Sequence, residues 1–225
     1  MSLSRRQKVA YSLGLSLNVI VVFILLHPQY SSWHAHGPIQ SGHTDIECNA
    51  CHQKSSGTLR QQLQAKVQFL LGNREENVHV ATRPVSNTQC LACHARDNDN
   101  HPVHRFNEPR FAKVRTKLMP QTCLGCHMEH TGKRVTQNID ICQNCHEDLK
   151  IKQDPITTSH YQLVKQQKWH TCLGCHDFHG NHIMTLPDTL TRLISKESIE
   201  AYFSDGESPY SQQKHHKAKK KLNET

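Results

Sequence analysis

Hydrophobic residues form one continuous run near the N-terminus of the chain. No charged residue occurs from Val9 to Leu26, and the run ends in eight consecutive apolar residues that begin at Val19. A helix of about 17 to 25 residues is long enough to cross the hydrocarbon core of a membrane. The pattern therefore predicts one transmembrane helix, with residues 1–27 forming a cytoplasmic N-terminus and anchor.

A cleaved signal peptide is the alternative reading of this run. Ser12, Ser16 and Asn18 weaken its first half, as in the short apolar region of a signal peptide. Cleavage needs small residues soon after the run, but His27 is followed by Pro28, Gln29 and Tyr30. The sequence therefore favours an uncleaved anchor.

The flanking residues predict the orientation of this anchor. Arg5, Arg6 and Lys8 precede it, and positive residues stay on the cytoplasmic side. We therefore expect a single-pass protein of the cytoplasmic (inner) membrane, with the body on the periplasmic side and with Tyr30 and Trp33 as interfacial aromatics.

The rest of the chain predicts a mainly α-helical fold with extensive loops and no strand. Apolar residues at helical spacing, with Thr58 as N-cap and Gly72 beyond the end, predict a helix that packs its stripe on a cofactor face: Leu59, Leu63, Val67, Leu70 and Leu71. A C-terminal helix is expected in 187–206, capped by Asp188 and closing near Gly206. It either packs on the core or docks a partner. Residues 207–225 read as a basic flexible tail.

Composition argues against a large apolar core. The chain is 36% hydrophobic, whereas an ordinary domain has roughly 45 to 50%. The formal net charge is +8, but the excess is mostly terminal and no basic stripe with interleaved aromatics occurs, so nucleic acid is not an expected partner. The unusual numbers are 10 Cys and 19 His. They indicate that something other than side chains fills the interior of 28–186.

All ten cysteines fall into five C-x-x-C-H motifs. The cysteine pairs are Cys48 and Cys51, Cys90 and Cys93, Cys123 and Cys126, Cys142 and Cys145, and Cys172 and Cys175, and the trailing histidines are His52, His94, His127, His146 and His176. In this motif two thiols bind the vinyl groups of one haem and the histidine becomes the proximal iron ligand. Zinc ribbons and disulfide frameworks do not require a trailing histidine. The sequence therefore predicts five covalently bound haem c groups.

Two of the motifs carry a resemblance to a known family. Cys123-Leu-Gly-Cys-His-Met-Glu-His130 and Cys172-Leu-Gly-Cys-His-Asp-Phe-His-Gly180 resemble the small multihaem c-type cytochromes of the cytochrome c3 and c7 type, over about 43 to 182. The resemblance implies a multihaem cytochrome c fold organised around its haems. It also implies a low-potential electron carrier with bis-histidine ligation and closely spaced haems. It does not imply five haems or an anchor.

Histidine is also the expected ligand on the second side of each iron. Outside the anchor only Met119, Met128 and Met184 could replace it, which is too few for five irons. His130 and His179 each follow a motif histidine by three residues; we expect a helical turn there, from which each would reach a neighbouring haem and not its own. The predicted distal set is His43, His101, His130, His160 and His179, with His104 a close rival of His101 and with His34, His36, His79, His170 and His182 as substitutes.

These features predict an electron-transfer protein and not an enzyme. A membrane-anchored pentahaem cytochrome would relay electrons between a membrane donor, quinol or a redox complex, and a periplasmic redox partner. Quinol oxidation is the weaker donor reading because Gln53 and Lys54 follow His52, without the nearby Met ligand of membrane-bound quinol-oxidising relatives. The alternatives are a reductase of a small nitrogen or sulfur oxyanion, with one open-site haem, and a structural or sensory haem module.

Overall fold

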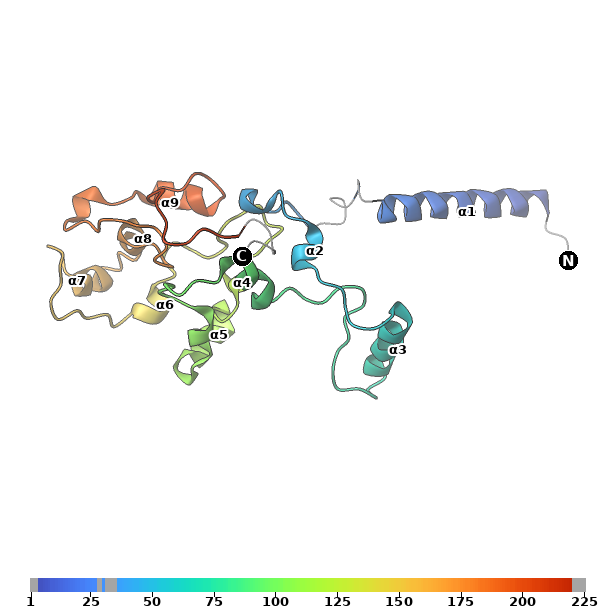
Figure 1. Cartoon of the computed structure of the whole chain (residues 1–225), viewed down its shortest axis with the longest axis horizontal. Coiled ribbons are helices and arrows are strands. Elements are labelled where there is room, and N and C mark those ends of the chain that lie inside the picture. The colour runs from blue at the N-terminus through green and yellow to red at the C-terminus, as the bar shows by residue number, and fades with distance from the viewer. Residues whose placement is uncertain (1–3, 28–29, 31–35, 220–225) are drawn as a thin grey trace. The chain divides into compact units, whose positions relative to one another are not determined.

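The computed structural model describes residues 4–27, 30 and 36–219, in two compact units that comprise 1–38 and 39–225. The described residues are mainly helical and contain no strand, which confirms the predicted fold class at that level (Figure 1). Their β-structure is limited to isolated bridges, Lys54 with Thr82 and His182 with Lys214. The first unit extends to Pro38, beyond the predicted boundary at residue 27. Trp33 and His34 lie outside the described residues.

The first unit contains the apolar helix α1 (Arg5–Leu26). Ser4 caps it in a reciprocal box, because the Ser4 hydroxyl accepts from the Gln7 backbone and the Gln7 side chain accepts from the Ser4 backbone at 2.9 Å. The stretch Arg5–Leu25 has a mean hydropathy of 1.9. Length and composition thus confirm an apolar N-terminal helix, which fits a membrane span and also a signal sequence.

In the second unit each C-x-x-C-H motif lies on a short helical element. The carriers are α2 (Cys48–Cys51), α4 (Asn87–His94), the 3-10 turn η5 (Cys123–Gly125), α6 (Gln143–His146) and α8 (His170–Cys175). In motifs one, three, four and five the trailing histidine donates its backbone N–H to the carbonyl of the first cysteine, at 2.8 to 3.0 Å. One helical turn therefore holds both thiols and the imidazole of a motif together.

Loops and short helices connect these carriers. They include η2 (Ser41–His43), η3 (Val103–Asn107), η4 (Pro109–Phe111), α5 (Ala112–Leu118) and α7 (His160–Lys165). The longest is α3 (Leu59–Leu70), where Thr58 forms the predicted N-cap and Gly72 lies beyond the end with a positive φ of 76°. The apolar stripe of α3 faces away from the protein, since Leu59 is 59% and Leu70 is 70% exposed.

The C-terminal helix is shorter than predicted. A 3-10 turn, η6 (Leu190–Arg192), comes first, and α9 (Lys196–Phe203) follows after an extended Leu193. Ser195, and not Asp188, caps α9, because its hydroxyl accepts from the Ser198 backbone; Asp188 instead pairs with Arg192 at 3.0 Å. The apolar side of α9 packs on α8, and the resulting core comprises Ile139, Leu173 and Ile199 with Phe178, Ile194 and Phe203 against it.

The prediction of a flexible tail from residue 207 is wrong for 207–219. Tyr210 is 6% exposed and its hydroxyl donates to the Leu173 carbonyl at 3.1 Å. Backbone hydrogen bonds attach the rest of the segment. The Gln213 carbonyl accepts from the Ile183 N–H at 2.9 Å, and the Lys219 N–H donates to the Cys93 carbonyl at 3.2 Å. The basic composition concealed these contacts, because they use one tyrosine and main-chain groups. Residues 220–225 lie outside the described part.

Candidate functional site

Histidine rings face one another in five pairs. Each pair joins one C-x-x-C-H histidine to one of the five histidines that the sequence nominated as distal ligands, and no histidine is used twice. The ring centroids are separated by 6.0 Å in His43–His94, 6.1 Å in His52–His130, 6.2 Å in His101–His146, 6.0 Å in His127–His179 and 6.3 Å in His160–His176.

This common separation suits one metal ion between two imidazoles. A bond of about 2 Å from each imidazole nitrogen to a metal, plus the distance from each nitrogen to its ring centre, separates two centroids by about 6.3 Å. The interplanar angles range from 23° to 87°. The pairs therefore share a centroid separation but not an interplanar angle. This is expected if the distance from each ring to a shared metal ion is what the pairs have in common.

Four of the pairs connect distant parts of the chain. His130, which follows the third motif, faces His52 of the first, and His179, after the fifth motif, faces His127 of the third. The predicted helical turn is wrong for both, because residues 127–130 and 176–179 are coil and turn, and His130 has a left-handed φ of 62°. A tight turn, and not a helix, carries each ring away from its own motif.

Hydrogen bonds at Nδ1 fix five of these rings. The partners are carboxylates or carbonyls, which only accept, so Nδ1 is the donor and Nε2 is the nitrogen left for a metal. The acceptors are Glu129 for His43, the Phe178 carbonyl for His101 at 2.6 Å, the Arg134 carbonyl for His127 at 2.7 Å, Asp154 for His160 at 2.9 Å and Asp99 for His179 at 3.0 Å.

Sequence reasoning missed the three carboxylates in this set. The available signal was their proximity to the candidate ligands, since Asp99 precedes His101 and Glu129 precedes His130. Asp99 accepts from the backbone N–H of His101 at 2.9 Å, but the rings that these acids orient lie elsewhere in the sequence: Asp99 accepts from the ring of His179 and Glu129 from that of His43. Only Asp154 orients a nearby ring, that of His160.

Charge at these contacts follows from burial and hydrogen bonding. Burial alone would raise the pKa of Glu129, but hydrogen bonds from His43 and Gln40 outweigh it and lower that pKa to about 2. The same bond raises the pKa of His43 against the effect of burial. At His127 burial dominates and lowers the pKa. A neutral imidazole is the form that can bind a metal.

No disulfide joins any of the ten cysteines, and two contacts join different motifs. A hydrogen bond links the thiols of Cys90 and Cys123, which raises the pKa of Cys90 and lowers that of Cys123 to about 7. A second links Cys142 and Cys172, with the pKa of Cys142 raised and that of Cys172 lowered. The second motif therefore lies against the third, and the fourth lies against the fifth.

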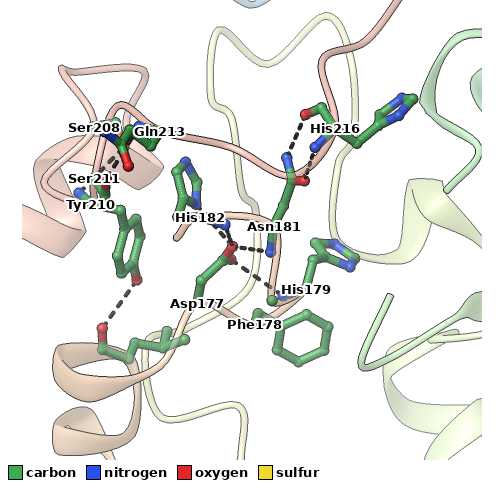
Figure 2. Close-up of polar contacts among 12 residues, drawn as sticks. Asp177, Phe178, His179, Asn181, His182, Ser208, Tyr210, Ser211, Gln213 and His216 are labelled. Carbon is green, nitrogen blue, oxygen red and sulfur yellow. Dashed lines mark hydrogen bonds and ion pairs between the residues drawn. The ribbon is translucent and has the colours of Figure 1, made fainter. Parts of the chain in front are cut away.

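The described substitute histidines take other positions. His36, His79, His104 and His170 are exposed. His182 is different, because its side chain is 6% exposed and its Nδ1 donates to Asp177 at 2.8 Å (Figure 2). Burial would raise the pKa of Asp177, but bonds from the His182 ring and backbone hold it well below its usual range.

Within the described ranges, no cluster of three or more His, Cys, Asp and Glu side chains converges as a structural zinc site requires. Comparison with known proteins adds no assignment: the chain matches no family model, no curated protein and no solved structure. The motifs and the paired rings are therefore the features that bear on function.

Proposed function

We propose that this chain is a membrane-anchored c-type cytochrome with five covalently bound haems, which relays electrons between a membrane donor and an exported redox partner. The observation that carries the proposal is the set of five facing histidine pairs. Each contains one motif histidine, and their separations agree within 0.3 Å, from 6.0 to 6.3 Å.

The residues present fit the implied cofactor. The two cysteines of each motif would hold one haem through thioether bonds, and the paired imidazoles would ligate its iron on both sides. The haem iron supplies one-electron Fe(III)/Fe(II) chemistry when bound. The small apolar core also agrees, since only eight hydrophobic residues of the described part are buried and three of them form the cluster around Leu173.

The protein's own groups would hold the iron ligands in place. Carbonyl and carboxylate acceptors fix Nδ1 of five rings, so that those rings need not reorient when the iron changes its charge. Because four pairs connect distant segments, each ligand bond would also cross-link the chain. Rigid ligation of this kind suits a carrier, whose task is to exchange electrons without rearrangement.

The reductase alternative receives less support. An open-site haem needs one motif histidine that no second ligand faces, so that a substrate can bind the iron. Here each of the five motif histidines faces another imidazole. No feature of the described residues favours a structural or sensory module over a relay.

The anchor and its orientation complete the proposal. α1 would cross the cytoplasmic membrane once, with Arg5, Arg6 and Lys8 on the cytoplasmic side and the second unit in the periplasm. The electron donor would then be quinol or a membrane redox complex. The acceptor would be a periplasmic redox protein.

The decisive experiment combines intact mass with electron paramagnetic resonance on protein extracted from membranes of a host competent in cytochrome maturation. We expect five haem additions and an entirely low-spin ferric spectrum. A Cys142→Ala/Cys145→Ala variant is the matched control and should carry four. Mass matching the bare chain, or zinc in place of iron, contradicts the cofactor. A high-spin component that binds cyanide or nitrite in the unaltered protein favours the reductase.

A further inference from the structure

Several hydrogen bonds attach the segment after residue 210 to Asn181 and to the second motif. The Asn181 amide donates to the His216 carbonyl and accepts from the His216 backbone, both at 3.0 Å. The His215 backbone also donates to the Asn181 carbonyl at 2.9 Å. Figure 2 shows the result: the Asn181 side chain holds the backbone of His216, and the His216 ring points away from it. The clamp therefore positions one imidazole.

This imidazole borders a hollow next to the second motif. The hollow has a volume of about 400 Å³ and is lined by Ala95, Arg96, Asp97, Asn98, His215 and His216. Its first four residues directly follow His94, whose electrostatic environment includes both Arg96 and His216. The backbone N–H of Lys219 donates to the Cys93 carbonyl and attaches the C-terminal segment to the same motif. The hollow thus lies at the edge of the site formed by Cys90, Cys93 and His94.

Two nitrogen atoms of residues that line this hollow are buried and have no hydrogen-bond partner in the described part of the chain: Nε of Arg96 and Nε2 of His216. Buried donors normally find a partner, since leaving one unsatisfied costs roughly 1 to 3 kcal/mol. The Nη2 nitrogen of Arg96 donates a long hydrogen bond to Asp99, at 3.4 Å, although the Arg96 side chain is only 13% exposed. Asp97 is exposed. A guanidinium and an imidazole donor at one hollow fit a carboxylate.

We propose that Arg96 and His216 bind a propionate carboxylate of the haem attached to Cys90 and Cys93, and that Asn181 positions His216 for this contact. The assignment rests on the proposed function, because haem supplies the carboxylates. It gives the C-terminal segment a role in setting the potential of one haem. A cationic donor that neutralises a propionate favours the reduced iron, so loss of that donor lowers the reduction potential.

The test is spectroelectrochemical titration of membrane-extracted protein in buffer without oxyanions. In Arg96→Gln we expect one of five one-electron transitions to move to lower potential while four stay in place. His216→Gln and Asn181→Ala should move the same transition in the same direction by a smaller amount. Arg96→Lys should restore part of the shift. The controls Arg110→Gln and His79→Gln, at exposed positions, should move none.

Mass and electron paramagnetic resonance separate the possible failures. Five haems and low-spin spectra in the variants show that attachment and ligation are intact. If no transition then moves, the propionate assignment is wrong. If potentials respond only to added inorganic phosphate, and Arg96→Gln abolishes that response, the hollow binds an anion from solution and the assignment is again overturned. If Arg96→Gln fails to mature, the propionate assignment is tested with His216→Gln and Asn181→Ala, which lie outside every motif. If the unaltered protein carries no haem, both this inference and the proposed function are wrong.

Discussion

The first and fifth motifs are chemically equivalent, but the protein holds them in different ways. Around the fifth, Trp169, Thr171, Leu173 and Gly174 are buried, and Leu173 packs against Ile199 of α9. Around the first, α2 has no buried residue, and the one buried side chain of the neighbouring α3 is the polar Gln62.

The contacts of Gln62 show what replaces an apolar core there. Its amide donates to the carbonyls of Ser55 and Gly57 at 3.1 Å, and its oxygen accepts from the Ala81 backbone at 2.9 Å. These bonds tie a loop to a helix but remove little apolar surface from water, and that surface is the main source of stability. The difference teaches that the fifth motif has a protein core of its own, whereas the first has none and would depend on the proposed haem.

Removing one haem at a time gives the largest expected contrast. In Cys48→Ala/Cys51→Ala we expect residues 44–58 to lose amide protection almost completely, because no apolar core remains to hold them. In Cys172→Ala/Cys175→Ala, α9 should keep part of its protection through Ile199 and Leu173. Hydrogen exchange followed by mass spectrometry measures both. Equal loss in the two variants would remove the distinction.

Removing a single facing histidine should have a smaller effect. His130→Ala and His160→Ala should each convert about one fifth of the haem to a high-spin or differently ligated form while five haems stay attached. Only His130→Ala should also increase exchange in 44–52, since His130 faces His52 from a distant segment, whereas His160 lies in α7 and faces the fifth motif. His179→Ala should give the same spectral change as His130→Ala. Unaltered low-spin spectra in both His130→Ala and His179→Ala would contradict neighbour ligation.

A pair of core substitutions compares the two regions without touching a motif. Ile199→Ala should lower the free energy of unfolding by about 2 to 5 kcal/mol, because Ile199 is fully buried. Leu63→Ala in α3 should change it by less than about 0.5 kcal/mol, because Leu63 is 49% exposed. Denaturant titration monitored by far-UV circular dichroism tests both. A comparable loss at Leu63 would show that the α3 stripe is covered, as predicted for a helix that packs on a haem face.

A smaller loss of stability than that of Ile199→Ala should come from Tyr210. Tyr210→Phe removes the hydroxyl that donates to the Leu173 carbonyl and should cost about 0.5 to 1.5 kcal/mol in the same titration. Tyr161→Phe, at a 44% exposed position, is the matched control and should cost nothing measurable. No loss at Tyr210 would mean that the 207–219 segment does not support the fifth motif.

Local patterns allowed much of this structure to be predicted. The charge-free run fixed α1, and Thr58 with its helical stripe fixed the start of α3, because both signals lie within a few turns. The nomination of His43, His101, His130, His160 and His179 used position relative to the motifs. The structure places each of these opposite a motif histidine.

Features that depend on contacts between distant residues could not be predicted. Which ring faces which motif is decided by turns such as the left-handed backbone at His130, and no local spacing reveals them. Attachment of 207–219 depends on Asn181 and Leu173, which lie far back in the chain. The start of α9 was misplaced because Asp188 and Ser195 are both good caps, and Leu193 interrupts the helix between them.

The order of the histidines along the chain determines when each facing pair can form during synthesis. His43 is already made when His94 emerges from the ribosome, whereas His52 meets its facing ring only after the polypeptide has grown to His130, and His127 only after His179. A chain that stops before His179 therefore leaves the imidazole of its third motif unopposed, even though that motif is complete. Premature termination well downstream of a motif can thus disable it.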